Sequence, residues 1–431
     1  MRYQSIPSDM FIQNRKNFTK QMKKDSLAVF VSNDIVTRSA DAGYKWRQNP
    51  DTFYLSGIDQ EETFLLLFSD APEAKYKEIL FVRRTSELIM VWEGKKHTIE
   101  EAKKISGVSE VYWSDSFEDI FNMLMHYADH VYLNTNEHDR SISMGEATEV
   151  KFARKVMNHF PLHKYERSAP IMHELRVSKS KYEVELLQKA IDITHKGFLR
   201  ALKFIKPGVW EYEVEAELTH EYVINRGSGH AYEPIVATGE NACVLHYVSN
   251  EAQCKAGDLL LMDCAAEYAN YNADLTRTVP VSGKFTARQK KVYNAVLRVH
   301  REAAAMMKSG VVLNDLNNEV RSIMEKELLG LGLLTKSEIA KQDKNKPAYK
   351  KYFPHGTAHF LGLDVHDVGN RFNKLQAGAV LTCEPGIYIQ EEKMGIRIEN
   401  NLLITKDKPL DLMKNIPIEA EEIEDLMNSK K

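Results

Sequence analysis

The sequence predicts an α/β domain over residues 1–170, followed over residues 171–431 by an α+β domain with an internal pseudo-twofold repeat. Three observations predict this fold class. The chain has 431 residues, which is too long for one ordinary compact domain and suits two. Short apolar runs alternate with amphipathic stretches in the first part. The second part repeats the order helix, helix, strands.

The first domain is predicted from five short apolar runs, separated by polar or amphipathic stretches. Runs of this length are typical of strands, and strands that alternate with helices are typical of an α/β domain. A domain boundary is expected near Ser168–Pro170. The five runs lie at residues 27–32, 63–68, 78–82, 111–113 and 131–133.

The second domain begins with two predicted helices. Ser180 and Glu183 have the form of a capping box, and apolar residues then recur at helical spacing as far as Ile205. Pro207-Gly208 ends that helix. A second helix is expected from about residue 211 to 226. The sequence that follows is rich in β-branched and aromatic residues, which favour strands.

The same order then recurs. Two further helices are expected before strand-like sequence returns at residues 353–405. The junctions between the paired helices are alike, with Lys206-Pro-Gly-Val209 in the first copy and Lys308-Ser-Gly-Val311 in the second. We interpret this likeness as an internal duplication. Chance similarity at a helix-to-helix turn is the alternative.

The last predicted helix of the second copy is expected to start at an Asn314 cap and to end near Leu329. Residues 331–354 after it are rich in lysine and irregular. We interpret them as a solvated loop.

The composition excludes several classes of protein. Apolar residues make up 43% of the chain and charged residues 28%, as in an ordinary globular protein. The net charge of −3 indicates neither a nucleic-acid partner nor a membrane surface. We expect no signal peptide, because residues 1–20 are broken by charges, and no membrane span, because no apolar run reaches spanning length. The four cysteines form no CxxC pair, which favours a reducing, cytoplasmic location.

Two aspartates are expected to face each other in the strand-rich part of the first copy. Asp263 ends an apolar run, and Asp274 opens the next strand. A turn near Tyr268-Ala269 would place the two carboxylates directly opposite each other. Like charges at that spacing are destabilising, and a bound cation would resolve the conflict. A strand-end acid and a turn acid are the ordinary interpretation of either residue alone.

The second copy offers a comparable set of acids. Glu384 follows an apolar run, and Arg397 and Glu399 share one face of an alternating strand. The stretch between Phe353 and His366 holds three histidines. Four carboxylates with one histidine form a mostly oxygen shell, which suits Mn²⁺ better than a structural zinc site. Cys264 and Cys383 are expected on the opposite strand face, in the core.

These residues resemble the pita-bread metallopeptidases of family M24, of the aminopeptidase P type. The shared motifs are Asp274-Leu-Thr-Arg-Thr, His359-Phe-Leu-Gly-Leu-Asp-Val-His366, Glu384-Pro-Gly and Arg397-Ile-Glu399. In the first domain, Arg38-Ser-Ala-Asp-Ala-Gly-Tyr-Lys-Trp-Arg-Gln-Asn49 is similar to the N-terminal domain of aminopeptidase P and prolidase. Ala265 departs from the pattern, since relatives often have glycine there, but it removes no ligand.

The resemblance implies a dinuclear metal site and a hydrolytic mechanism. Two divalent ions, with Mn²⁺ expected and Co²⁺ or Zn²⁺ as alternatives, would share a bridging water that attacks the carbonyl before proline. Glu384 would be the proton shuttle. His246 and His366 would bind the substrate, and His355 and Arg397 would orient ligands. The implied metal ligands are Asp263, Asp274, His359, Glu384 and Glu399, with Asp274 and Glu399 bridging.

The resemblance also implies the substrate and its contacts. Peptides with proline in second place are expected, with Tyr232 and Tyr388 as walls of the site. Trp92 matches a tryptophan that relatives lend to a neighbouring subunit, so a homo-oligomer (dimer or tetramer) is expected. A buried strand tryptophan is the alternative for Trp92, and a histidine at the sheet surface is the alternative for His246.

Three rival functions share this fold. A prolidase would cleave only Xaa-Pro dipeptides with the same five ligands. A creatinase-like hydrolase needs no metal, and a non-catalytic binding protein would have lost ligands. The complete ligand set favours a metallo-aminopeptidase over the last two.

Overall fold

The structure, a computed structural model, describes residues 2–138, 140, 145–343 and 346–429. The chain folds into two compact units, and the division falls between Arg176 and Val177. It lies beyond the boundary expected near Ser168–Pro170, because helix α7 (Ala169–Val177) remains with the first unit. There, Arg176 donates from Nη1 to Oδ1 of Asp51 at 2.8 Å.

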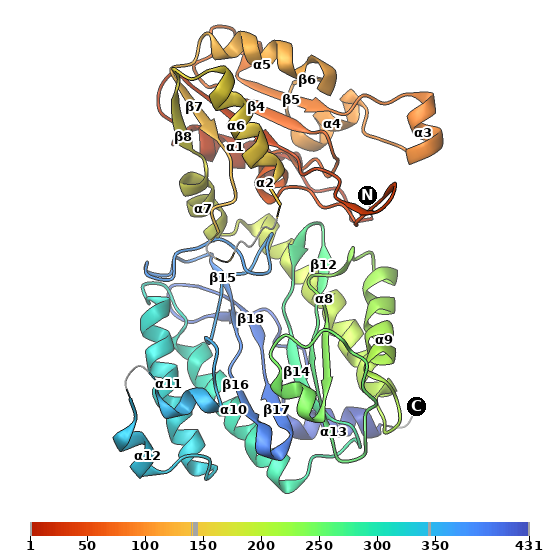
Figure 1. The fold of residues 1–431 in the computed structure, drawn as a ribbon, viewed down its shortest axis with the longest axis vertical. Helices are drawn as coiled ribbons and strands as arrows, with labels where there is room; N and C mark the ends of the chain where they lie inside the picture. Colours follow the sequence, from red (N-terminus) through yellow and green to blue (C-terminus); the bar gives the residue numbers. More distant parts are fainter. Residues whose placement is uncertain (1, 139, 141–144, 344–345, 430–431) are drawn as a thin grey trace. The chain divides into compact units, whose positions relative to one another are not determined.

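Six strands of the first unit form one mixed sheet (Figure 1). The central strand β1 is antiparallel to β4 and parallel to β7. All five predicted runs are strands, so the α/β prediction is confirmed. The sixth strand was not predicted because its sequence, Lys-Tyr-Glu-Arg, is polar. In spatial order the strands are β6 (Glu110–Trp113), β5 (Glu78–Val82), β4 (Phe64–Leu67), β1 (Ser26–Val31), β7 (His130–Leu133) and β8 (Lys164–Arg167).

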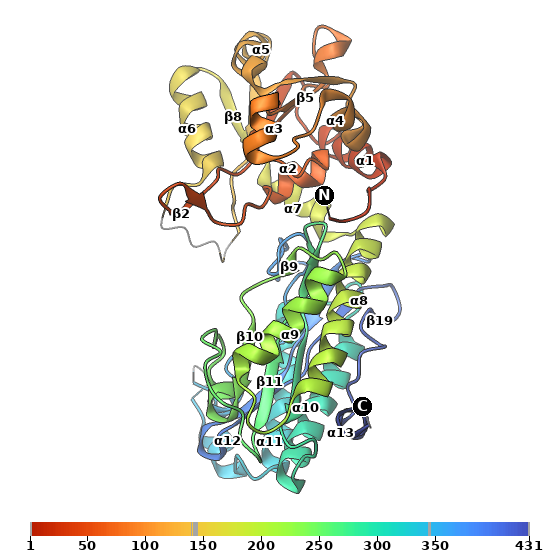
Figure 2. The ribbon, with the colours of Figure 1, turned by 90° about the vertical axis from the view of Figure 1, so that its right-hand side faces the viewer.

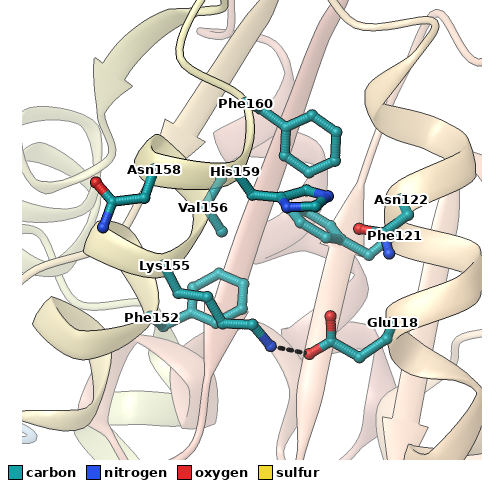
Figure 3. Close-up of a pocket in the computed structure, with 9 residues that line it drawn as sticks. All are labelled: Glu118, Phe121, Asn122, Phe152, Lys155, Val156, Asn158, His159 and Phe160. Atoms are coloured by element: carbon teal, nitrogen blue, oxygen red, sulfur yellow. Dashed lines mark hydrogen bonds and ion pairs between the residues drawn. The ribbon is translucent and has the colours of Figure 1, made fainter.

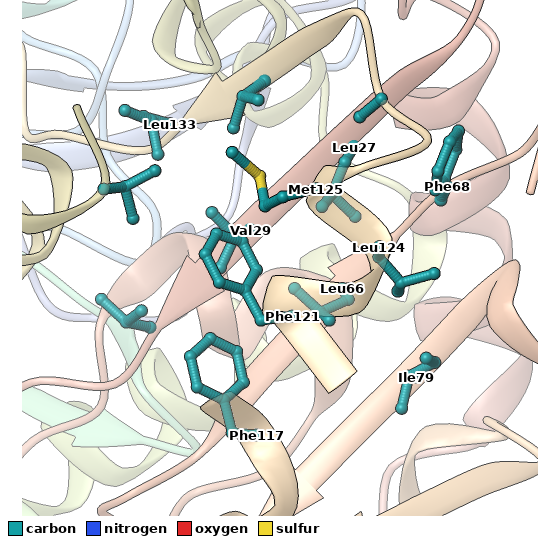
Figure 4. Close-up of a cluster of buried hydrophobic side chains, with 14 of the residues drawn as sticks. Leu27, Val29, Leu66, Phe68, Ile79, Phe117, Phe121, Leu124, Met125 and Leu133 are labelled. Carbon is teal, nitrogen blue, oxygen red and sulfur yellow. The ribbon is translucent and has the colours of Figure 1, made fainter. Parts of the chain in front are cut away.

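Helices cover both faces of this sheet, which explains why its central strands are continuously apolar. Leu27 and Val29 of β1 face a cluster that contains Phe117 and Phe121 from α5 (Figure 4). On the other face, the Phe30 ring packs edge-on against Phe18, with centroids 5.1 Å apart. The helices of this unit before α7 are α1 (Ser8–Thr19), α2 (Pro50–Ser56), α3 (Glu87–Glu93), α4 (Ile99–Ser106), α5 (Phe117–Met125) and α6 (Thr148–His159).

In the second unit the order helix, helix, strands occurs twice, as predicted. The first pair, α8 (Lys181–Phe204) and α9 (Glu211–Ile224), lies side by side in Figures 1 and 2. Gly197 permits this packing, since a Cβ there would lie 2.6 Å from the Tyr222 ring. The Ser180–Glu183 capping box is present as predicted. The second pair is α10 (Ala287–Met306) and α11 (Leu313–Gly330).

The strands of the second unit form small antiparallel sheets, and the chain described ends with helix α13 (Ala420–Asn428). The first copy contributes β9 (Gly229–His230), β10 (Ile235–Thr238), β11 (Leu259–Asp263), β12 (Ala266–Tyr268), β13 (Tyr271–Asn272) and β14 (Thr276–Pro280). The second contributes β15 (Val380–Cys383), β16 (Gly386–Ile389), β17 (Met394–Arg397), β18 (Asn400–Leu403) and β19 (Leu410–Asp411).

The register predicted for the aspartate hairpin was wrong by two residues. Asp263 pairs with Thr276, not with Asp274. The reason is the turn, which is centred on Ala269 and Asn270, both with positive φ, so the opposed positions shift along the strand. A shift of two keeps every side chain on its own face. Asp263 and Asp274 therefore still point to the same side.

Two details of the second helix pair also differ from prediction. Helix α11 begins after Val312, so Asn314 lies inside the helix and is not its cap. The stretch 331–354 is not simply a solvated loop. It contains α12 (Lys336–Lys341), and the apolar side chains Leu331, Tyr349 and Phe353 are buried. Burial of these residues outweighs the lysine content.

Among the residues that the structure describes, no helix combines the length and the apolar character that crossing a bilayer requires.

Candidate metal centre

Three of the predicted ligands converge in the second unit from segments far apart in the chain. Asp274, His359 and Glu399 each offer one ligand atom, and these atoms lie within 4.8 Å of one another. All three side chains are buried. Nε2 of His359 lies 3.3 Å from Oδ2 of Asp274.

Backbone pairing fixes the position of His359. The segment around it runs beside β15, where the Thr382 N–H donates to the His359 carbonyl at 2.9 Å. Nδ1 of His359 lies 3.0 Å from the Phe360 carbonyl oxygen. A carbonyl only accepts, so Nδ1 carries the proton and Nε2 is left to face the carboxylates.

Glu399 joins the two copies of the repeat. Its N–H donates to the Thr276 carbonyl of β14 at 3.1 Å, and its Oε2 accepts from the Thr276 hydroxyl at 2.6 Å. Arg277, which is fully buried, donates to the carbonyl oxygens of Glu399 and Pro417. These bonds hold the Glu399 backbone against β14. Burial, with repulsion from Asp274 and Glu384, raises the pKa of Glu399 well above its usual value.

Asp263, at the end of β11, is held by two donors. The Tyr232 hydroxyl donates to its Oδ1 at 2.6 Å, and Nη2 of Arg397 donates to its Oδ2 at 2.6 Å. Burial raises the pKa of Asp263, while Arg397 acts in the opposite direction. The predicted orienting role of Arg397 therefore has a visible contact.

Glu384 follows β15 directly and reaches the same pocket. Its N–H donates to the Thr357 carbonyl at 2.8 Å, and its Oε1 lies 3.9 Å from Nε2 of His359. Burial raises the pKa of Glu384 to about 7, although His359 and Arg397 lower it. Burial lowers the pKa of His359, but the bond to Asp274 and the charge of Glu384 leave it raised overall.

The charges of this pocket fit divalent cations. Two buried carboxylates, Asp274 and Glu399, and two partly buried ones, Asp263 and Glu384, lie in this pocket. They face one permanent cation, Arg397, and one titratable cation, His359. Buried charge without compensation is costly, so carboxylates here tend to hold protons instead of ionising. Two divalent ions would supply the missing positive charge. An oxygen-rich set with one imidazole suits Mn²⁺ and similar ions.

His355 and Tyr388 form a layer behind the ligands. The Tyr388 hydroxyl lies 2.8 Å from Nε2 of His355 and accepts from Nη1 of Arg397 at 2.8 Å. Burial lowers the pKa of His355 to about 3, so its ring is neutral. Tyr388 is only 5% exposed, and its hydroxyl serves this network.

The two predicted substrate histidines differ in their surroundings. The His366 ring stands perpendicular to that of His359, with centroids 4.4 Å apart, so the pocket includes it. His246 is exposed, in a turn after the short helix η3 (Gly239–Cys243). The alternative of a strand histidine at the sheet surface is therefore wrong.

Trp92 lies in the first unit, on helix α3. Its side chain is 80% exposed, so the alternative of a buried strand tryptophan is wrong. Helix α3 has no buried residue, so its apolar side chains lack the spacing of a helix that packs on a core. The sequence around Trp92 therefore resembled a strand. Whether Trp92 reaches a neighbouring subunit stays a prediction.

Cys264 and Cys383 lie in the core, as expected. Both are buried, and their thiols point to the backbone carbonyls of Ile235 and His300.

A separate cavity of about 370 Å³ in the first unit lies between α5 and α6 (Figure 3). Phe121, Phe152 and Phe160 line it, and the ion pair between Lys155 and Glu118 stands at its rim. It lacks the converging carboxylates of the second unit, so we do not assign it to the chemistry.

Three residues that hold the site together were not predicted as functional. Thr276 and Arg277 lie within the motif that begins at Asp274, and that position was the available signal. Glu211, described below, had none, because a glutamate in the first turn of a helix is usually a solvated, dipole-compensating residue.

Comparison with known proteins gives consistent matches for both units. Residues 185–406 match the family model described as "Metallopeptidase family M24", and residues 11–132 match that of "Aminopeptidase P, N-terminal domain". The chain is 32% identical to a Xaa-Pro aminopeptidase of Haemophilus influenzae and 33% identical to one of Escherichia coli. In both cases, 98% of each chain is covered.

A solved structure is also similar over nearly the full length. Zinc-substituted aminopeptidase P of E. coli in complex with product has a TM-score of 0.88 at 32% identity. The similarity covers 99% of this chain and 100% of that one.

Proposed function

Because this chain belongs to metallopeptidase family M24 and carries the N-terminal domain of aminopeptidase P, we propose that it is a Xaa-Pro aminopeptidase. It would remove the first residue from peptides with proline in second place. The observation that carries this proposal is the convergence of buried Asp274, His359 and Glu399 from both copies of the repeat. Asp263 and Glu384, which are partly buried, lie in the same pocket.

The five ligands in this proposal are Asp263, Asp274, His359, Glu384 and Glu399, and Mn²⁺ is the expected metal, with Co²⁺ and Zn²⁺ as alternatives. When bound, a pair of divalent ions lowers the pKa of a shared water towards neutrality. The charge deficit of the pocket and its oxygen-rich donors support this assignment.

Glu384 is the proposed proton shuttle. Its carboxylate reaches into the pocket beside His359, where it can take a proton from water and pass it on. The water oxygen forms a bond to the carbonyl carbon before proline. As the C–N bond breaks, Glu384 passes the proton to the proline nitrogen, so atoms and charge balance.

His246 and His366 are proposed to bind the substrate and the oxyanion that develops on its carbonyl. His366 is suited to this by its position against His359. His355 and Arg397 would act through neighbouring side chains and not directly on the substrate. Arg397 donates to Asp263 and to Tyr388, and His355 holds the same tyrosine, so together they orient the ligands.

Proline lacks an amide N–H, so a proline-specific site must recognise the ring and the free amine instead. We assign walls of this site to Tyr232 and Tyr388. Their hydroxyls are engaged by Asp263 and Arg397, which fixes the two side chains beside the proposed ligands.

We also propose a homo-oligomer in which α3 contacts a second copy. Leu88, Val91 and Trp92 on this helix are 68%, 80% and 80% exposed, which is costly for a surface left in water. A cytoplasmic location is supported by the four free cysteines, three of which are buried.

A peptide panel tests the proposed function. Peptides Xaa-Pro-Xaa, Xaa-Pro and Xaa-Ala-Xaa are compared with Mn²⁺ and with a chelator. We expect cleavage of the proline tripeptide only, and only with metal. Turnover of the dipeptide alone would identify a prolidase, and no turnover at full metal occupancy would indicate a binding protein.

A further inference from the structure

The segment that carries His246 has little regular structure of its own. It runs from η3 to residue 252, with Val244 and Val248 53% and 51% exposed. A histidine on such a segment can bind a substrate only if the backbone is held in place, because a small displacement of a binding group is costly in rate. The residue that holds it lies on another element.

Glu211, the first residue of α9, has an exposed fraction of 0%. Its carboxylate accepts hydrogen bonds from four donors, all of them on or beside this segment. Oε1 accepts from the N–H of Thr238 at 2.7 Å and from Nδ2 of Asn241 at 3.2 Å. Oε2 accepts from the Tyr247 hydroxyl at 2.8 Å and from the N–H of Ala252 at 2.9 Å.

The four donors are spread along the segment from Thr238 to Ala252, so the single side chain of Glu211 anchors both of its ends. Thr238 stands before it, Asn241 and Tyr247 lie within it, and Ala252 ends it. Tyr247 is the immediate neighbour of His246. The N-terminus of a helix favours an anion, so α9 supports the carboxylate. The two oxygens of a carboxylate can accept all four bonds, whereas an amide presents donors on one side.

Contacts from β17 and α9 fix the rest of the segment. A Cβ at Gly395 would lie 2.1 Å from the Ala242 carbonyl oxygen, so η3 packs directly on the strand that carries Arg397. Asn250 donates to Oε2 of Glu215, one turn after Glu211 on α9, at 2.8 Å. The segment is thus held between the metal-site strand and α9.

We propose that Glu211 is a positioning residue that sets the place of His246 against the substrate. This inference rests on the proposed function, since it assumes that His246 contacts the peptide. Glu211 itself touches no metal ligand in the described structure, so its removal should leave ion binding unchanged.

Glu211→Gln is compared with Glu213→Gln. Glu213 lies in the same turn of α9, but its carboxylate accepts from the N–H of Trp210, the N-cap of its own helix. Both variants lose one negative charge. We expect kcat/KM for a Xaa-Pro-Xaa peptide to fall by on the order of 10²-fold in Glu211→Gln, with manganese content as in the wild type. Glu213→Gln should stay near the wild type.

A double-mutant cycle with His246→Ala separates positioning from a general loss of structure. If Glu211 acts through His246, Glu211→Gln in the His246→Ala background should change kcat/KM by less than about two-fold. A merely structural role would give the same loss in both backgrounds. Tyr247→Phe, which removes one of the four bonds, provides a milder variant if Glu211→Gln does not fold.

Hydrogen exchange distinguishes failure of this inference from failure of the proposed function. Faster exchange confined to residues 238–252 in Glu211→Gln supports the anchor even if the wild type cleaves no proline peptide. Unchanged exchange there, or kcat/KM equal to that of Glu213→Gln in an active enzyme, would overturn it.

Discussion

The core of the first unit and the metal pocket of the second are both buried, but they stabilise the protein in opposite ways. Leu66, Phe81 and Leu124 have exposed fractions of 0% and contact other apolar groups. In the pocket, Asp274 and Glu399 are only 4% and 2% exposed, yet their ionised carboxylates repel each other. Stability is concentrated in the first region, and the second is held ready for cations.

The free-energy scales of the two regions explain this division. Burying a large apolar side chain contributes about 1.5–3 kcal/mol, whatever is bound elsewhere. Moving a charged group from water into the protein interior costs roughly several kcal/mol unless a partner of opposite charge compensates it. The pocket therefore gains stability only when positive charge enters, whereas the apolar core needs nothing further.

The largest expected effect is that of Glu384→Gln, which removes a charge and a proton carrier from the pocket. We expect kcat to fall by about 10²–10⁴-fold with the fold retained. Burial raises the pKa of Glu384 to about 7, so its ionisation penalises folding as the pH rises. The ion-free variant should therefore be more stable than the ion-free wild type at alkaline pH.

Peptide kinetics and chemical denaturation measure these two effects. Glu392→Gln, on the surface beside Arg288, is the matched control. Normal hydrolysis by Glu384→Gln would refute the shuttle role.

Phe121→Ala tests the apolar core of the first unit. The Phe121 ring lies in the cluster between α5 and the sheet and is 2% exposed. Its truncation should lower the free energy of unfolding of the first unit by about 3–5 kcal/mol without changing metal content. Denaturation curves and metal analysis measure both. Leu162→Ala, at a side chain that is 96% exposed, should have almost no effect, and a comparable loss there would contradict this account.

Thr276→Val tests how the pocket is held together. The Thr276 hydroxyl donates to Glu399 and accepts from Nε of Arg397 at 3.0 Å. Removing such a partner should weaken metal binding by roughly 10–100-fold. Titration with Mn²⁺ measures the change. Thr194→Val removes an equally buried hydroxyl of α8 and should leave metal affinity unaltered.

The smallest expected effect concerns His300, a buried histidine of α10. Burial lowers its pKa to about 3, and neither ring nitrogen has a partner in the described structure. The unfolded chain takes up a proton below pH 6.5, whereas the folded chain remains neutral down to about pH 3. Stability is therefore full above pH 6.5 and decreases as the pH falls.

The loss should reach about 1.4 kcal/mol one pH unit below the unfolded pKa. Comparing denaturation of the wild type and His300→Leu across this range isolates the effect. His220→Leu, at a side chain that is 49% exposed, is the matched surface control. Equal slopes for wild type and His300→Leu would show that His300 is not responsible.

Much of the fold could be predicted from local patterns. The five apolar runs and the Ser180 capping box lie where the structure has strands and a helix start. The hairpin register could not be predicted, because the exact turn residues decide it and a polar turn has several forms. The polar strand β8 was missed because its pairing with β7, not its own sequence, makes it a strand.

The five candidate ligands were found because acids after apolar runs conflict with burial and because their motifs are shared with a family. Glu211 had no such signal, and Arg277 had only its place in the motif that begins at Asp274. Their contacts join residues far apart in the sequence, such as Arg277 with Pro417, and only the folded chain reveals them. Contacts between the two copies of the repeat cannot be predicted from the local spacing of apolar and polar residues.

The most direct test is the metal content of the chain together with its turnover. Protein loaded with Mn²⁺ should contain about two ions per chain, and turnover of a Xaa-Pro-Xaa peptide should disappear as a chelator removes them. Glu399→Gln should lose both ions and turnover. Protein that binds no ions when Mn²⁺ is supplied in excess would contradict the account. So would protein that remains active after its ions are completely removed.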